Sequence, residues 1–309
     1  MNNESNVIKF DKRRRKKKHK RRQINQNKMA VIVFCFIVVI SIYGVHKCTV
    51  DGNGFQGMLY EINQEEKIYN DIYSQLTAFK TRISFNTSNY NIMSEMVSKQ
   101  YRKVLSDHPE LFWLSGGAEA SGVTSAAGTL LFYEVDTICD MDDAKVKATQ
   151  LESVVQNIIE LTNSHCTSDY DKAKYVHDLL VLNCEYDMDT YYSYLDNPTS
   201  DSGLGYTAYG CLVDHKAVCA GYSKAYQLIM NKLGIECGFV YGIGINDDGQ
   251  GPHAWNYICL DGKYYMVDVT WDDPLGNSGD VVYDTYFCIS PQQMAVDHIR
   301  DLECIVPYE

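Results

Sequence analysis

The sequence has no CxxC pair and no regular cysteine spacing, although 11 of its 309 residues are cysteines. No spacing of cysteines and histidines suits a structural zinc site, and no acidic loop has the spacing of a calcium site. No internal repeat is visible, so nothing indicates a repeat architecture. We therefore expect no metal and no other cofactor, and we look for chemistry in ordinary side chains.

The cysteines are explained by reduced thiols without a disulfide framework. Buried thiols behave as small hydrophobic side chains, and a reducing or anaerobic habitat would keep them free. Because an exported domain can hold disulfides, bonds among the ten cysteines outside the N-terminal apolar run stay an open alternative. Five of the cysteines lie among apolar or aromatic neighbours: Cys184, Cys211, Cys237, Cys259 and Cys288.

Positive charge is scarce beyond the N-terminus. Past residue 49 the chain has 15 Lys and Arg against 38 Asp and Glu, whereas residues 12–22 alone contain ten Lys and Arg. The formal net charge of -12 therefore averages an acidic body with a basic tail. A basic run in isolation is typical of nucleic-acid binding, so its meaning depends on the residues that follow it.

An uncharged run of 17 residues, Met29 to Val45, follows the basic tail. As a helix it would extend about 26 Å, close to the thickness of a bilayer's hydrocarbon core. The positive-inside rule then places residues 1–28 in the cytoplasm and residues 47–309 across the membrane. No Ala-x-Ala-like cleavage site follows, and Val45-His-Lys-Cys48 fits a lipoprotein box poorly. We predict an uncleaved signal anchor at residues 29–46, and so a single-pass protein of the cell membrane.

Two alternatives to this anchor stay open. The run can be a cleaved signal peptide, or it can be a core helix of a cytoplasmic protein whose tail binds nucleic acid. We expect no nucleic-acid partner, because the adjacent apolar run makes the basic tail an orientation signal that contacts anionic lipid headgroups. The oligomeric state cannot be read from the sequence.

Beyond the anchor we predict a linker at residues 47–59, a mainly helical region at 60–165 and a catalytic domain at 166–309. A helix near its start is expected to begin at Ser168 or Asp169, and residues 185–210 read as a long polar loop. That helix covers 170–182, with Ser168 or Asp169 as its N-cap. The other elements expected from periodicity are helices over 60–80, 90–105 and 142–161, and a strand over 128–136.

A cysteine stands at the predicted start of a further helix. Apolar and tyrosine side chains recur at helical spacing from Tyr222 to Leu233, and Gly234 is a typical residue just past a helix end. Cys219 therefore lies in the first turn, where the helix dipole and free N–H groups favour a thiolate and an oxyanion. A buried structural cysteine at a helix start is the alternative.

A histidine and an aspartate follow on a predicted hairpin. Asp261-Gly262 indicates a type I′ turn, in which Leu260 pairs with Lys263. That register places His253 and Asp268 on the same face as diagonal neighbours, whereas a slip of one residue would separate them. Each residue alone has an ordinary structural explanation. Together with Cys219 they can form a cysteine, histidine and aspartate triad for acyl transfer.

The spaced motifs over about residues 170–300 resemble the bacterial transglutaminase-like superfamily. The segment from Asp107 to Trp113 also resembles the helical region that precedes such domains in some membrane-anchored members. The residues that carry the main resemblance are Tyr209 to Tyr226, Leu233-Gly-Ile235, His253-Ala-Trp-Asn256, Asp261-Gly-Lys-Tyr-Tyr265 and Val267-Asp-Val-Thr-Trp-Asp-Asp-Pro274.

The resemblance implies an α+β class with a papain-like core, in which a nucleophile helix packs on an antiparallel sheet. It implies that Cys219 is the nucleophile, His253 the base and then the acid, and Asp268 the residue that orients the histidine. The implied activity is acyl transfer or hydrolysis at carboxamide or peptide bonds through a thioester. Because the superfamily includes domains that have lost activity, an inactive surface domain that binds envelope protein or glycan is the alternative.

The remaining site expectations concern the groove around the triad. Tyr186 and Tyr209 are candidates for the side chain that completes the oxyanion hole, and Trp255 is either a substrate contact or a packing residue. His215, four residues before Cys219, either tunes the thiol or lies exposed in a turn. From the predicted topology we expect the substrate to be a protein or peptide of the cell envelope.

Overall fold

A computed structural model of the chain describes residues 54–126, 128–197, 203–247, 249–273, 281–304 and 306–307, with side chains from residue 64 onward except Leu195. The basic tail and the predicted anchor at residues 29–46 lie outside these residues. No helix in the described ranges is long and apolar enough to cross a membrane. Residues 1–66 and residues 67–309 form two compact units.

The first helix, α2, spans Gly54–Thr77 and begins inside the segment predicted to be a linker at 47–59. Two glycines near its start cost the helix only about 1 kcal/mol each, which a 24-residue helix tolerates. The next helix, α3, spans Tyr90–Asp107, and the Asn89 side chain caps it by accepting from the Ile92 N–H.

The region before residue 140 contains a sheet where only one strand was expected. Its order is β1-β3-β2, with β1 at Arg82–Thr87, β2 at Leu114–Ser125 and β3 at Gly128–Thr137, all antiparallel. The sequence concealed β2 because its residues are small or polar and nearly all are exposed. Backbone pairing with β3 holds it in the sheet, so its side chains carry little strand signal.

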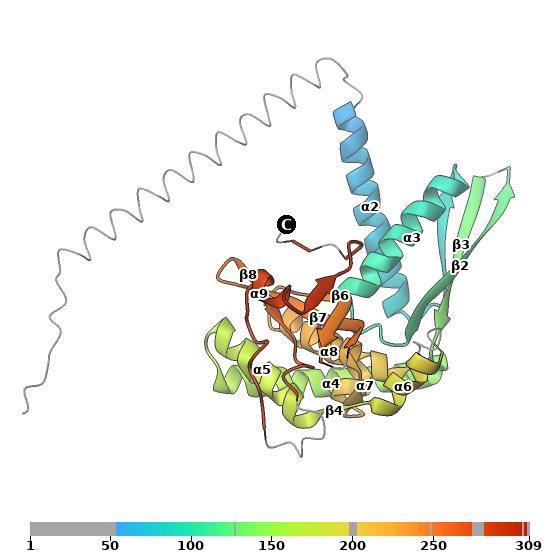
Figure 1. The fold of residues 1–309 in the computed structure, drawn as a ribbon. Helices are drawn as coiled ribbons and strands as arrows, with labels where there is room; N and C mark the ends of the chain where they lie inside the picture. Colours follow the sequence, from blue (N-terminus) through green and yellow to red (C-terminus); the bar gives the residue numbers. More distant parts are fainter. Residues whose placement is uncertain are drawn as a thin grey trace, which may run out of the picture. The chain divides into compact units, whose positions relative to one another are not determined.

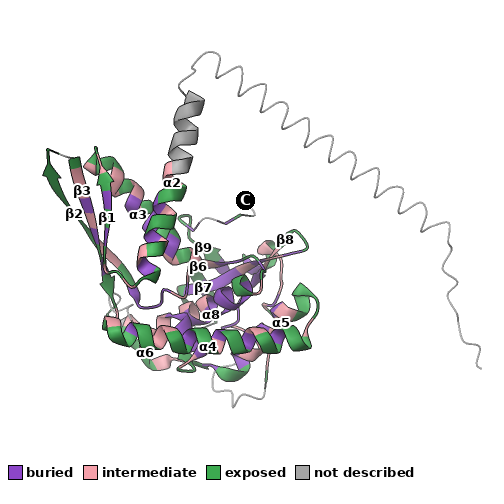
Figure 2. Ribbon diagram, turned by 180° about the vertical axis from the view of Figure 1, so that it is seen from behind, coloured by how far each residue is buried: buried purple, intermediate pink, exposed green. Residues whose placement is uncertain are grey.

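In the C-terminal domain, helix α8 at Cys219–Lys232 packs between a sheet and the helices α4 and α5 (Figure 1). The sheet is antiparallel in the order β8-β7-β6-β9, and α8 contacts β6 and β7 on one side and α4 and α5 on the other. Figure 2 shows the resulting burial of α8 and β7. The bounds are α4 Met141–His165, α5 Asp169–Asn183, α8 Cys219–Lys232, β6 Cys237–Asn246, β7 Gly249–Leu260, β8 Lys263–Val267, α9 Pro291–Met294 and β9 His298–Arg300.

Several sequence expectations are confirmed in this domain, including the mixed α+β class. Ser168 caps α5 by accepting from the Asp171 N–H. Helix α8 begins at Cys219, and Gly234 follows its end with a φ of 79°. The residues of the β7–β8 hairpin pair from Leu260↔Lys263 to Asn256↔Val267, which is the predicted register.

The segment at 185–210 is not the long loop that its polarity suggested. It contains β4 at Glu185–Tyr186, α6 at Met188–Asp196, a 3₁₀ turn at Leu204–Tyr206 and the start of α7, which spans Ala208–Leu212. Its polar residues include helix caps: Asp187 accepts from the Thr190 N–H, and Thr207 accepts from the Gly210 N–H. The polar residues of this segment were interpreted as a loop, but some of them are the N-caps of short helices.

Candidate active site

Cys219 is the first residue of α8, and nothing on the preceding residue caps the helix. Val218 occupies the N-cap position and has no side-chain oxygen to accept the first N–H groups. Two tyrosines hold this helix against α5, because the Tyr222 hydroxyl donates to the Cys184 carbonyl and the Tyr226 hydroxyl to the Ala173 carbonyl. The helix start is therefore a fixed, positively polarised position for a thiolate.

The hairpin delivers His253 and Asp268 to one point. Asp261 and Gly262 have φ values of 52° and 71°, as a type I′ turn requires. Strand pairing ends at Val267, so Asp268 is the first residue beyond β8. Its Oδ2 lies 2.6 Å from His253 Nε2, and both side chains are buried.

Asn256 connects the hairpin to the cysteine's helix. Its Nδ2 donates to the Ser223 carbonyl on α8 at 2.9 Å and to the Gly238 carbonyl on β6 at 3.1 Å. The side chain is fully buried, so these bonds are shielded from water. The asparagine of the His253-Ala-Trp-Asn256 motif therefore fixes Cys219 and His253 relative to each other.

The charges of the three groups support one another. Burial lowers the pKa of His253, but the charge and hydrogen bond of Asp268, together with a hydrogen bond to Cys219, raise this pKa to about 10. Burial raises the pKa of Asp268, but the two histidines that contact it, His253 and His298, hold that pKa well below its usual range. Because Nε2 of His253 is bonded to Asp268, Nδ1 is the nitrogen left for the thiol proton.

Sequence reasoning missed His298, the second histidine on the same carboxylate. Its Nε2 lies 3.0 Å from Asp268 Oδ2, and its side chain is completely buried. It stands 30 residues after Asp268 on the three-residue strand β9, and no spacing pattern marks it. Only the pairing of β9 with β6, which sets His298 opposite Gly244, brings it to the triad.

The ligand-type atoms of His253, Asp268 and His298 lie within 4.8 Å of one another, a proximity that also suits a metal ion. Hydrogen bonding explains the distances better. Two ligands of one tetrahedral zinc ion are separated by about 3.3 Å, whereas His253 Nε2 and Asp268 Oδ2 are 2.6 Å apart. The short distance is that of a direct hydrogen bond.

A groove of about 600 Å³ opens beside His253. Six of the 16 described residues that line it are tyrosine or tryptophan, and Asp273 is the one acidic side chain among them. Burial and the charge of Glu185 raise the pKa of Asp273 to about 6, against a hydrogen bond from Tyr222. The aromatic lining residues are Tyr186, Tyr191, Tyr192, Trp271, Tyr283 and Tyr286.

Of the two oxyanion candidates, the structure brings only Tyr186 to the site. Strand β4 pairs in parallel with β5, Lys216–Ala217, which sets Tyr186 opposite Ala217, two residues before the cysteine. Burial and the charge of nearby Cys219 raise the pKa of Tyr186, so its hydroxyl keeps its proton. Tyr209 lies elsewhere in the core, where it donates to Gln150 Oε1 at 2.7 Å and stacks on Phe112.

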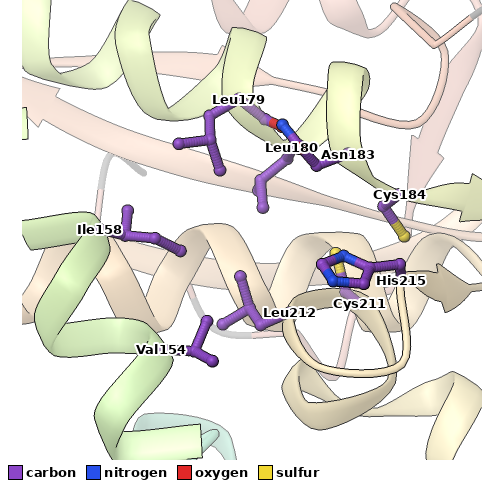
Figure 3. A pocket seen from close by; sticks show the side chains of 9 residues that line it. All are labelled: Val154, Ile158, Leu179, Leu180, Asn183, Cys184, Cys211, Leu212 and His215. Atoms are coloured by element: carbon purple, nitrogen blue, oxygen red, sulfur yellow. The ribbon is translucent and has the colours of Figure 1, made fainter. Parts of the chain in front are cut away.

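Trp255 and His215 occupy structural positions. Trp255 is buried at 2 % exposure, stacks beside His253 with ring centroids 6.1 Å apart, and does not line the groove. His215 is exposed with a φ of 57° and lines a different, largely apolar pocket with Cys184 and Cys211 (Figure 3).

Residues 156–269 match the model of the Transglutaminase-like superfamily, and this range includes Cys219, His253 and Asp268 but not His298. The chain is 22 % identical over 172 residues to the kyphoscoliosis peptidase of Mus musculus, covering 52 % of this chain and 25 % of the relative. It is 29 % identical over 99 residues to the kyphoscoliosis peptidase of Homo sapiens, covering 28 % and 15 %. The chain thus spans a quarter or less of the length of these curated relatives.

Two solved structures are also similar. One is described as a TGase, with a TM-score of 0.35 and 20 % identity, covering 64 % of this chain and 52 % of that one. The other is a putative cysteine protease from Cytophaga hutchinsonii, with a TM-score of 0.30 and 13 % identity, covering 51 % and 63 %.

Proposed function

We propose that this chain is a cysteine enzyme of the transglutaminase-like superfamily, because residues 156–269 match the model of that superfamily. In this proposal Cys219, His253 and Asp268 transfer or hydrolyse acyl groups at carboxamide or peptide bonds. The observation that carries it is the convergence of a cysteine at an uncapped helix start with a buried histidine and aspartate 2.6 Å apart.

The first half of the reaction forms a thioester. Nδ1 of His253 takes the proton of the Cys219 thiol, and the sulfur attacks the carbonyl carbon of the substrate. The first N–H groups of α8 and the Tyr186 hydroxyl donate to the oxyanion that develops on the carbonyl oxygen. When the tetrahedral intermediate collapses, His253 returns its proton to the departing ammonia or amine, and the acyl group stays on the sulfur.

The second half releases the acyl group. Water or a primary amine attacks the thioester carbonyl, and His253 accepts a proton from the attacking group. The sulfur leaves and recovers the proton through His253, so Cys219 ends as a thiol. Water gives an acid, whereas an amine such as a lysine side chain gives a cross-link. Asp268 keeps Nδ1 of His253 directed at the sulfur throughout.

The substrate and the location follow from the predicted anchor at residues 29–46. If residues 47–309 lie outside the cytoplasm, a protein or peptide of the cell envelope is the substrate that the groove meets. The aromatic walls suit a peptide backbone with flanking apolar side chains, since tyrosines offer both ring faces and hydroxyl groups. The alternative is a surface domain that keeps this fold for binding and has lost catalysis.

Trapping of the acyl-enzyme tests the proposal. The full chain in detergent is incubated with a glutamine-containing protein or an activated acyl ester, quenched in acid and mapped by mass spectrometry. We expect the acyl mass on Cys219 and its transfer to a labelled amine or to water. Cys288→Ala serves as the matched control that keeps activity, because burial raises the pKa of that thiol to about 12. An unmodified Cys219 with both reagents would leave the binding-domain alternative.

The two tyrosine candidates give a paired prediction. Tyr186→Phe removes the hydroxyl beside Cys219, and we expect kcat to fall about 10- to 100-fold with little change in KM. Tyr209→Phe removes only the bond to Gln150, so we expect unchanged kcat and a loss of about 1 kcal/mol of stability. Steady-state kinetics and urea unfolding of both variants check this. Equal effects on kcat would remove Tyr186 from the oxyanion hole.

A further inference from the structure

Asp268 has four donors around its two oxygens. Oδ1 accepts from the backbone N–H of Thr270 at 3.0 Å and of Trp271 at 3.2 Å. Oδ2 accepts from His253 at 2.6 Å and from His298 at 3.0 Å. A buried carboxylate has room for about four donors, so Asp268 is a fully bonded, ionised acceptor. Nε2 of His298 must therefore carry a proton.

The other nitrogen of His298 faces a second carboxylate. Nδ1 lies 2.6 Å from Asp297 Oδ1, and Asp297 Oδ2 accepts from the Tyr286 hydroxyl at 2.7 Å. A neutral imidazole has one donor and one acceptor, so it would set a lone pair against one of the two carboxylates. Both contacts are satisfied when His298 donates from both nitrogens, that is, as an imidazolium.

The surroundings of His298 suit a cation. Its ring centroid lies 4.3 Å from that of Trp271 and 4.9 Å from that of Trp255, and aromatic rings attract cations. The described titratable groups that face it are Asp268 from the end of β8, Asp297 beside it on its own segment, His253 from β7 and, through Asp297, Tyr286.

Glycines on β6 make room for this arrangement. A Cβ on Gly244, the partner of His298 across the strands, would come within 2.8 Å of the Trp271 ring and 3.2 Å of His253. A Cβ on Gly242 would come within 2.1 Å of the Ile299 carbonyl and block the approach of β9. The Gly242-Ile-Gly244 spacing therefore packs β9 and the triad histidine close together.

We propose that His298 is a positioning residue of this site, an imidazolium held between Asp268 and Asp297 that shares the negative charge of Asp268 with His253. Two bonds on Oδ2 fix the carboxylate's orientation, and the second cation weakens its hold on the proton of His253. His253 can then return that proton to the leaving group more readily than in a triad without His298. The positioning role of His298 rests on the proposed function. The positive charge on His298 does not, because it follows from the contacts of the ring with two carboxylates.

The charge on His298 is tested first, in the wild-type chain and without substrate. The full chain in detergent is labelled with ¹⁵N-histidine, and the signals of His298 are assigned by their loss in His298→Gln. We expect both ring nitrogens to carry protons at neutral pH, as their contacts with two carboxylates require. A ring with one unprotonated nitrogen near neutral pH would overturn the proposal.

The positioning role is tested by the pH dependence of the His253 ring-nitrogen signals in the same ¹⁵N spectra. His298→Gln can still donate to Asp268 but has no charge, so Asp268 holds the His253 proton more tightly and the pKa of His253 rises. We expect the midpoint of the His253 titration to rise by about one pH unit. We expect a smaller shift in the same direction for Asp297→Asn, and none for His165→Gln on the exposed end of α4.

These outcomes separate the inference from the proposed function. Wild-type midpoints in His298→Gln and Asp297→Asn would overturn the positioning role even if acyl-enzyme forms on Cys219. Failure of acylation, with the predicted midpoint shift present, would overturn the proposed reaction and leave His298 in its role. If His298→Gln lowered the stability in urea unfolding without a shift of the pH midpoint, His298 would have only a packing role, and the positioning role would be overturned.

Discussion

Replacing Asp268 with asparagine is expected to lower kcat about 1,000- to 10,000-fold while the protein stays folded. Asparagine has nearly the same shape, so the bonds from the Thr270 and Trp271 N–H groups to the retained oxygen survive. The substitution acts on the 2.6 Å bond to His253, because an amide group toward Nε2 offers a donor where an acceptor is needed. The ring then takes the wrong tautomer or turns away from the thiol.

The pH dependence of this variant follows from the sign of the shift. Asp268 contributes to the rise of the His253 pKa to about 10, so the neutral asparagine lowers it toward the ordinary histidine value. The residual activity should therefore lose its alkaline limit near pH 10 and depend on a group that titrates closer to neutrality. Steady-state rates across pH check both effects.

A matched control is available in the same hairpin. Asp261→Asn changes an exposed aspartate to asparagine at a φ of 52°, a conformation that asparagine tolerates, and we expect unchanged activity. If Asp268→Asn retained the wild-type kcat, the aspartate would have no role in orienting His253.

Local chemistry made much of the candidate site predictable. The Asp261-Gly262 turn determines the hairpin register, and the register determines which face His253 and Asp268 share. Helical periodicity and Gly234 likewise gave both ends of the cysteine's helix. These signals lie within about 15 residues of the groups they place, which is why a single sequence carries them.

The features that the sequence concealed depend on contacts distant in the chain. His298 reaches Asp268 because a three-residue strand pairs with β6, and so short a strand has no periodicity to recognise. Strand β2 is held by backbone bonds to β3 and displays small, exposed side chains. Tyr186 and Tyr209 look equivalent in the sequence, and only the β4–β5 pairing distinguishes them. Backbone pairing does not depend strongly on side-chain identity, so composition cannot report it.

A second histidine, His177, also lies between two aspartates, and it supports the segment that follows Asp268. His177 on α5 is fully buried, with Nδ1 2.9 Å from Asp178 Oδ1 and Nε2 3.2 Å from Asp272 Oδ2. Asp272 is also fully buried, and its carboxylate accepts from the Tyr286 N–H. Burial lowers the pKa of His177, but the hydrogen bonds and charges of Asp178 and Asp272 raise it above the ordinary value. His177 therefore fixes Asp272, four residues beyond Asp268.

Replacing His177 with leucine is expected to lower the free energy of unfolding by about 3–5 kcal/mol, because it leaves the buried charge of Asp272 without its cation. The histidine's raised pKa also sets the pH dependence. Its contribution is fully present below the unfolded value of about 6.5 and is lost as pH rises through the folded value. Urea unfolding at several pH values should show the wild type losing stability above neutrality, and His177→Leu losing less of it.

The control is His165→Leu, the same substitution at an exposed histidine that ends α4, for which we expect a change within about 0.5 kcal/mol. If His177→Leu were as stable as wild type at neutral pH, Asp272 would not be a buried anion that needs His177. In that event the Asp268–Asp272 segment would be held by its backbone bonds, Asp272 N–H to the Asp268 carbonyl and Tyr283 N–H to the Asp272 carbonyl, at 3.3 Å and 3.1 Å. The position of the Asp268 carboxylate would then be independent of the ion pair between His177 and Asp272.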